Sequence, residues 1–125
     1  MALQVSIQSV DPFDNYVQVT GKLIPSGSYV TGGDTVNFTT AVEDPLFTGM
    51  TPAIPSSQPP FAFSAFSQGG NLVNQYASVI GATQATCKMK VSAASTFGTE
   101  FAAGAYSAAI LADNIGFIAC FPKFV

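Results

Sequence analysis

A strict alternation of apolar and polar residues opens the chain and predicts β-strands. In residues 3–8, leucine, valine and isoleucine alternate with glutamine and serine, which is the period of a strand with one buried and one wet face. The same period returns in residues 16–24, after a cluster of turn-forming residues at 11–15. We therefore predict that these two segments pair as a hairpin or a meander.

Short strand-like segments recur along the rest of the chain, and glycine, proline, asparagine or aspartate separates many of them. The further predicted strands are 35–39, 61–66, 73–80, 83–93, 106–111 and 115–121. The last two are expected to pair through a tight turn at Asp113 and Asn114.

The alanine-rich stretch 95–112 is the one place where helix propensity competes with these patterns. Gly98 and Gly104 interrupt any apolar stripe of helical spacing. We predict a loop in this stretch, with at most one short turn around residues 99–103.

Prolines concentrate in the middle of the chain. Five of the eight prolines lie in residues 45–60, and each one removes a ladder donor and fixes φ. This segment is therefore predicted to be a long irregular loop, of the length that in a compact domain is usually functional or mobile.

These elements together predict an all-β fold. The 125 residues are the size of one domain with one core, so residues 1–125 are expected to form a single domain. Many short strands with regularly spaced turns are typical of an antiparallel β-sandwich or barrel, jelly-roll-like, here with a long proline-rich loop.

The scarcity of charge changes the expected surface. Charged residues make up 9% of the chain, against about 25% in an ordinary soluble domain, and the hydrophobic fraction is 48%. No apolar run approaches the ~20 residues of a membrane-spanning helix, so no membrane association is predicted. The surface is instead expected to be covered by copies of the chain or by a partner.

Basic residues are too few for a nucleic-acid partner. The net charge is −3, the only cations are four lysines, and arginine is absent. Binding to phosphates needs several cations on one face. Lys88 and Lys90 share a strand face, but they are expected to act as a solubilising edge.

The N-terminus and the cysteines indicate a reducing compartment. The first residues enter the strand pattern directly, without the basic and apolar regions of a secretory signal, so we expect synthesis and retention in the cytoplasm, or release by lysis. Cys87 and Cys120 are then expected to be buried thiols rather than a disulfide.

The chain offers little catalytic chemistry. It has no histidine, which is the commonest general base and a frequent metal ligand. The adjacent acids Glu43 and Asp44 are interpreted as a solvated turn, because calcium wants six or more oxygens. Gly32-Gly33-Asp34 is predicted to be a turn with glycine at positive φ. We predict no catalytic residue, cofactor or metal, and hence no enzyme.

Aromatic and proline residues next to each other suggest an assembly surface. Phe61 and Phe63 are expected to share one face of a strand and Phe66 the other, so that one face joins the core and the other contacts a partner. The candidate assembly interface comprises Pro52, Pro55, Pro59, Pro60, Phe61, Phe63 and Phe66.

The segment Gly-Ser-Tyr-Val-Thr-Gly-Gly-Asp-Thr-Val-Asn-Phe-Thr at residues 27–39 resembles a pattern common in small structural proteins of tailed bacteriophages. The ending, Gly-Ala-Tyr at 104–106 and then residues 113–123, is similar to the closing hairpin of those proteins. Together these stretches cover about a fifth of the chain. They are signatures of turns and strands, and carry no site chemistry.

The resemblance implies a capsid decoration (cement) protein, a class of β-rich domains that often form trimers over the joints between major capsid subunits. It implies that the partners are the chain itself, as a homotrimer, and a major capsid protein. The location implied is the capsid surface of a virion, after synthesis in the host cytoplasm. Such a protein stabilises a shell through many weak contacts, which reinforce one another once the first has formed.

Three alternatives stay open. A tail-tube protein, or another structural protein of the phage head and tail, would share this composition, and its ring size would distinguish it. A carbohydrate-binding β-sandwich would normally display aromatic platforms, whereas this chain has no tryptophan and four tyrosines. A carboxylate-based hydrolase needs two converging acids, and the sequence gives no sign of such a pair.

Overall fold

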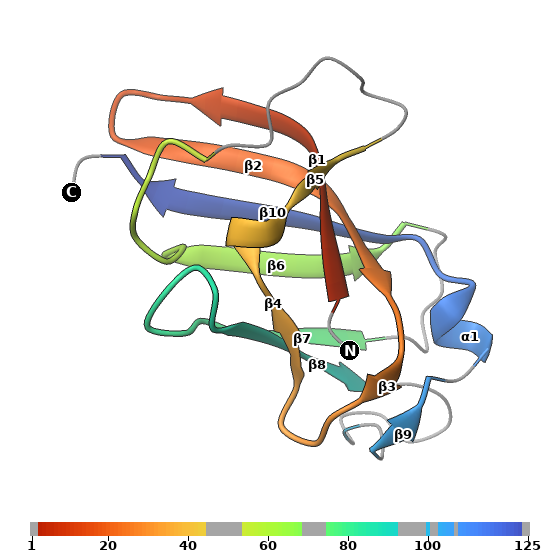
Figure 1. Cartoon of the computed structure of the whole chain (residues 1–125). Helices are drawn as coiled ribbons and strands as arrows, with labels where there is room; N and C mark the ends of the chain where they lie inside the picture. The colour runs from red at the N-terminus through yellow and green to blue at the C-terminus, as the bar shows by residue number, and fades with distance from the viewer. Residues whose placement is uncertain are drawn as a thin grey trace.

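The computed structural model describes residues 3–44, 54–68, 75–92, 100, 103–106 and 108–123, which form a strongly curled β-sheet (Figure 1). The strands are β1 (Leu3–Pro12), β2 (Tyr16–Pro25), β3 (Ser28–Tyr29), β4 (Asp34–Val36), β5 (Val42–Glu43), β6 (Ala62–Ser67), β7 (Gln75–Val79), β8 (Cys87–Ser92), β9 (Gly104–Ala105) and β10 (Ile115–Pro122). A 3-10 turn, η1 (Phe38–Thr40), and a short helix, α1 (Ala108–Leu111), interrupt them.

The main sheet curls until its two ends meet. Its strand order is β6-β10-β2-β1-β4-β8-β7, with β5 also paired to β1. At the ends of this order, the Ser78 hydroxyl of β7 donates a hydrogen bond to the Phe63 carbonyl of β6 at 2.5 Å. The sheet is thus a nearly closed barrel, and the predicted all-β fold is confirmed. Most pairs are antiparallel, but β4 and β5 run parallel to β1.

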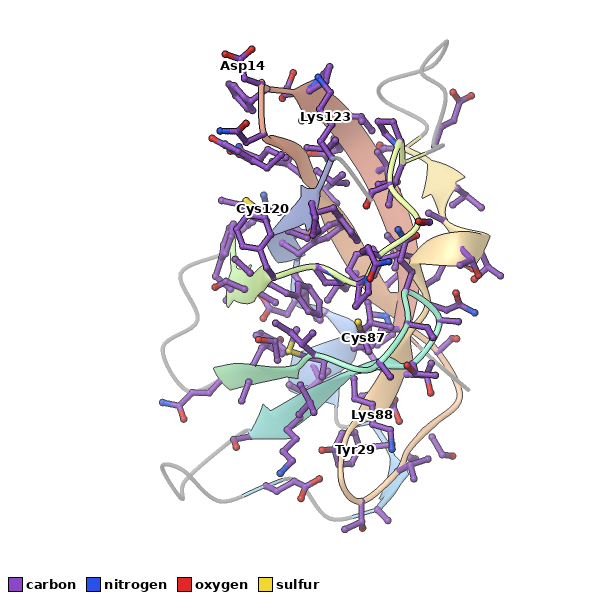
Figure 2. All side chains as sticks on the ribbon, turned by 90° about the vertical axis from the view of Figure 1, so that its left-hand side faces the viewer. Asp14, Tyr29, Cys87, Lys88, Cys120 and Lys123 are labelled. Carbon is purple, nitrogen blue, oxygen red and sulfur yellow. The ribbon has the colours of Figure 1, made fainter. Side chains whose placement is uncertain are left out.

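The two ends of the barrel carry different elements. The turn of the β1–β2 hairpin, which holds Asp14, lies at one end, and Tyr29 of the small β3–β9 sheet lies at the other (Figure 2). The hairpin confirms the predicted pairing of the first two alternating segments.

A bulge in β1 brings the hairpin against β5. The register of β1 with β2 shifts between Ile7 and Ser9, which leaves Gln8 as the extra residue. The Gln8 side chain donates to Asp44 Oδ2 at 3.0 Å, and the Asp44 backbone N–H donates to the Ile7 carbonyl at 3.0 Å. Asp44 is buried. The interpretation of Glu43 and Asp44 as a solvated turn is therefore wrong for Asp44, because its carboxylate pairs with the bulge.

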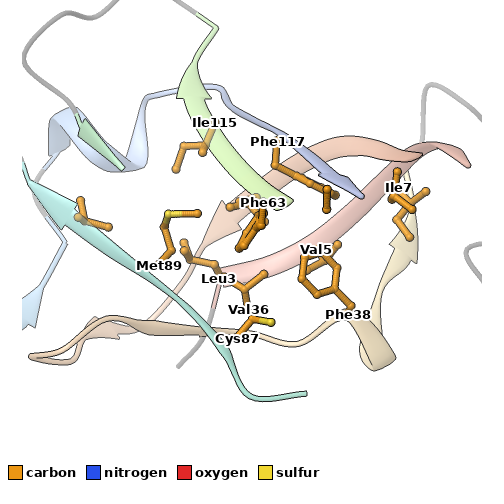
Figure 3. Packing of buried hydrophobic residues seen from close by; sticks show 14 of the residues in the cluster. Leu3, Val5, Ile7, Val36, Phe38, Phe63, Cys87, Met89, Ile115 and Phe117 are labelled. Atoms are coloured by element: carbon orange, nitrogen blue, oxygen red, sulfur yellow. The ribbon is translucent and has the colours of Figure 1, made fainter. Parts of the chain in front are cut away.

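The core fills the barrel interior with the inward residues of the alternating strands (Figure 3). Phe38 lies among three other phenylalanines, with its ring centroid 5.2 Å from Phe63, 5.1 Å from Phe121 and 5.9 Å from Phe117, all edge-on. Each such buried ring stabilises the fold by about 1.5–3 kcal/mol. The alternating residues Cys87, Met89 and Val91 of β8 are buried, as their pattern predicts.

Phe38 reaches the core from a turn rather than from the predicted strand 35–39. The strand ends at Val36 because Asn37 caps the 3-10 turn, with its Oδ1 accepting from the Thr39 backbone N–H at 2.9 Å. This local bond of an asparagine side chain competes with the strand ladder. Both Val36 and Phe38 are still buried.

The predicted strand 106–111 is wrong, and so is the closing hairpin. Residues 108–111 form α1, in which Ile110 is buried, and alanine favours this helical turn. The following strand, β10, pairs with β2 and β6 instead. The turn expected around 99–103 falls mostly outside the described residues.

The predicted proline-rich loop is described only in its second half. Residues 54–60 contain no strand, as expected, and residues 45–53 lie outside the described residues. In the described part of the chain, no helix is long and apolar enough to cross a membrane.

Candidate functional site

One side of the barrel presents a three-stranded surface with almost no charge. Strand β10 lies between β2 and β6, and its residues pair with both: Ile118 lies opposite Thr20 and Ser64. Because side chains alternate along a strand, the outward positions of the three strands form one surface. This outer face consists of Tyr16, Gln18, Thr20, Lys22, Ile24, Ala62, Ser64, Phe66, Gly116, Ile118, Cys120 and Pro122. Lys22 is the one charged residue among them.

An aromatic cluster continues the outer face toward the hairpin turn. The rings of Phe13 and Tyr16 stack with centroids 4.8 Å apart, and Phe61 meets Tyr16 edge-on at 6.3 Å. The Phe61 backbone N–H donates to the Cys120 carbonyl at 2.9 Å, which fixes its position beside β10. Phe13 is 45% exposed and Phe61 58% exposed, so much of their apolar area faces outward.

Phe66 lies at the opposite end of the outer face and has a structural role as well. It pairs with Gly116 of β10, and a Cβ on Gly116 would lie 2.7 Å from Phe66 Cε2. The ring therefore covers the backbone of the glycine, which is a known way for an aromatic residue to stabilise a glycine on a neighbouring strand. Phe66 remains 42% exposed.

The structure separates the predicted interface residues into two groups. Phe61, Phe66 and Pro55 are exposed, whereas Phe63 is 7% exposed and belongs to the core. Pro60 is buried, Pro59 is half-buried, and Pro52 lies outside the described residues.

The expectation that Phe61 and Phe63 share a face is therefore wrong. Strand β6 begins at Ala62, so Phe61 is not part of its alternation and turns outward. Phe63 follows the alternation and points into the barrel. The core assignment thus holds for Phe63 alone.

The described part of the proline loop is held against the barrel. The Gln84 side-chain amide donates to the carbonyls of Ser56 at 2.7 Å and Gln58 at 2.9 Å. The Ser56 hydroxyl donates to the Pro122 carbonyl at 2.5 Å, and Ile54 packs on the core. The segment that precedes Phe61 is therefore fixed to the barrel.

Sequence reasoning missed Phe13, Tyr16, Ile118 and Cys120 as parts of this surface. The available signal was the unbroken apolar run in residues 115–121. In an antiparallel sheet with one wet face, apolar and polar residues alternate, so a run that is apolar at every position indicates a second covered face.

The other end of the barrel holds a group of partly buried hydrogen bonds around Tyr29. The Tyr29 hydroxyl donates to Glu100 Oε2 and accepts from the Val91 backbone N–H at 3.2 Å. Glu100 Oε2 also accepts from the Gly32 N–H at 2.7 Å. Burial, and then the bond to Glu100, raise the pKa of Tyr29 to about 12, so its hydroxyl stays protonated as a donor.

Asp34 forms the second half of this group. It accepts from the Val30 N–H at 2.9 Å and from the Tyr106 hydroxyl, and its carboxyl is buried. Burial raises the pKa of Asp34 above its usual value. The preceding Gly32 and Gly33 have φ of 95° and 113°, which confirms the predicted glycine turn. These bonds hold the segment that contains β9 against the barrel. Their role is therefore structural.

Neither cysteine is in a disulfide. Cys87 is buried as predicted, while Cys120 is half-buried on the outer face, and burial raises the pKa of both thiols. Within the described residues, no group of three acids or cysteines is placed to hold a metal ion.

No protein-family model, no curated protein and no solved structure matches this chain.

Proposed function

We propose that this protein is a structural component of a virus particle, a capsid decoration (cement) protein whose outer face binds a major capsid protein. The observation that carries the proposal is the composition of that face. It displays Phe66 and Ile118 at 42% and 41% exposure and adjoins Phe61 at 58%, and Lys22 is its one charge. The centres of protein interfaces are likewise poor in charge and rich in aromatic residues.

The rigidity of the outer face also supports binding. Its side chains stand on three hydrogen-bonded strands, and Phe61 is fixed by its backbone bond to Cys120. A surface that is ordered before it binds loses less conformational entropy on binding. Modest contacts of this kind become strong when many copies act on one shell.

Four of the seven acids have hydrogen bonds within the fold, which supports a structural role for them. Asp34, Asp44 and Glu100 hold bonds within the barrel, and Asp113 accepts from the hydroxyls of Ser67 and Tyr76, both at 2.6 Å. Because the donors to these carboxylates are the protein's own groups, holding the fold together accounts for them without a substrate.

The tyrosines give little support to the carbohydrate-binding alternative. Tyr29 and Tyr106 are buried, and one face of Tyr16 is covered by Phe13. A sugar platform needs an open ring face.

Co-sedimentation with expanded shells of the major capsid protein from the same virus tests the proposal. The wild type is expected to sediment with the shells as a homotrimer. Ile118→Lys places a charge at the centre of the outer face and should weaken binding at least about tenfold, since central apolar contacts dominate interfaces. The matched control is Leu111→Lys, an exposed residue of α1, which should bind like the wild type.

Two results would count against the proposal. A wild type that does not sediment with shells contradicts the decoration role. A six-membered ring or a tube that ignores shells favours the alternative of a tail-tube protein.

A further inference from the structure

The charged residues left over from internal bonding are distributed unevenly over the barrel. All eleven charged residues lie in the described part of the chain. Four acids take part in the bonds described above. Of the remaining acids, Asp11 and Asp14 lie at the β1–β2 turn, whereas Glu43 of β5 pairs with Ile7 farther back along β1. Two of these three acids thus lie at the hairpin end.

The hairpin patch is defined here as Asp11, Phe13 and Asp14. Both acids are exposed, and Phe13 between them is 45% exposed. Lys123 lies beside the patch, where its Nζ donates to the Phe13 carbonyl at 2.8 Å. The two acids outnumber this lysine, so the hairpin end carries a net negative charge. The patch therefore combines an apolar centre with an acidic rim.

The opposite character appears on the outward side of β7 and β8. The lysine patch is defined here as Lys88, Lys90, Val79 and Ile80. Lys88 and Lys90 are exposed on one side of β8, and Val79 lies opposite Lys88 in the register with β7. Val79 and Ile80 are exposed apolar residues. Glu100 lies close enough to Lys90 to interact electrostatically, but Lys88 lies nearer the exposed apolar pair.

We infer that a second copy of this chain docks its hairpin patch on the lysine patch of the first. Figure 2 shows Asp14 and Lys88 toward opposite ends of the molecule. Each patch presents apolar area with a net charge, negative at the hairpin and positive at the lysines, even with Lys123 and Glu100 counted. Complementary potentials of this kind select partner and orientation.

The position of the patches determines the type of assembly. Two different surfaces of one molecule form a head-to-tail contact, which repeats until it closes as a ring or continues as a chain. Phe13 lies against Tyr16 at the edge of the outer face, but the centre of that face, around Ile118 and Phe66, takes no part in this contact and stays available for the shell. The inference thus rests on the proposed assembly role but uses another surface.

Light scattering with charge reversal tests the contact. The wild type should exceed the monomer mass at low salt, and its mass should fall in about 0.5 M salt, where the screening length is below ~5 Å. Lys88→Glu with Lys90→Glu should weaken self-association about tenfold, and so should Asp11→Lys with Asp14→Lys.

Mixing the two double variants is the decisive step. One then carries acids on both patches and the other lysines on both, so they should associate with each other although neither associates with itself. Lys22→Glu is the matched control on the outer face and should keep the wild-type mass. Thermal melts of each variant verify folding.

Separate outcomes overturn the two claims. Any of three results rejects the head-to-tail contact. The wild type could stay monomeric at low salt, the mixture could fail to associate, or Lys22→Glu could weaken self-association as much as the double variants do. Shell binding is measured on the same samples. Rings that form but ignore shells reject the decoration role and leave the contact between copies intact.

Discussion

Single residues at the β3–β9 end should make stability depend on pH in two opposite ways. Burial raises the pKa of Asp34 above the 3.8 of an ordinary aspartate. A raised pKa contributes stability that is present below the unfolded pKa and is lost as pH rises through the folded pKa. The advantage of the wild type over Asp34→Asn in unfolding free energy should therefore shrink as pH rises above the ordinary aspartate value.

Glu100 should show the reverse trend in the same measurement. The Tyr29 hydroxyl and the Gly32 N–H hold the pKa of Glu100 below 4.5, so its contribution is present above that value and is lost as pH falls through the folded pKa. Urea titrations of Asp34→Asn and Glu100→Gln, carried out from acid pH below the ordinary carboxyl values up to neutral pH, check both signs. If the two variants lost or gained unfolding free energy relative to the wild type in the same direction with pH, the opposite pKa shifts of Asp34 and Glu100 would be contradicted.

At the same scale, the sequence predicted the glycine turn at residues 32–34 but not the task of Asp34. Positive φ is a local property of the backbone, and glycine is the residue that adopts it most readily. The bond from Tyr106 joins residues 72 positions apart, and no local pattern reports such a pair.

Among the elements, β2 depends on a residue that has no side chain. Gly21 occupies an inward position of the alternation, and a Cβ there would lie 2.0 Å from the Ser6 carbonyl oxygen and 2.9 Å from Phe117 Cε1. Gly21→Ala should destabilise the protein by about 3 kcal/mol, because backbone must move to relieve the overlap.

A chemical denaturation curve measures this effect. Gln18→Ala is the control in the same strand, at an outward position, and should change stability by less than ~0.5 kcal/mol. A Gly21→Ala variant as stable as the wild type would show that the strands can separate at no cost.

The strands themselves were largely predictable, because alternation is encoded residue by residue. Strands β1, β2, β6 and β8 fall within or close to their predicted ranges. The failures at 35–39 and 106–111 arise where a cap on Asn37 and a buried Ile110 override the local pattern.

For the molecule as a whole, the two thiols should report different events. Cys87 is buried in the core, so a thiol reagent should reach it only after global unfolding. Cys120 is half-buried on the outer face, and should react in the native state, slowly because burial raises its pKa.

Shell binding through the outer face should protect Cys120 and leave the reaction of Cys87 unchanged. Reaction rates with and without shells, and with Cys120→Ser to assign the signal, measure this. If Cys120 were labelled as fast in the shell-bound protein as in the free protein, the shell contact would lie on another surface.

The sequence by itself determined the β class, the hairpin, the glycine turn and the scarcity of charge, because each follows from local alternation, local backbone preference or composition. Only the tertiary structure decided which residues share a surface. Phe13, Phe61 and Cys120 are far apart in the chain and meet because β10 inserts between β2 and β6. Strand order depends on long-range pairing, so the outer face, the inward position of Phe63 and the opposite placement of the acidic and basic patches became visible only in the folded barrel.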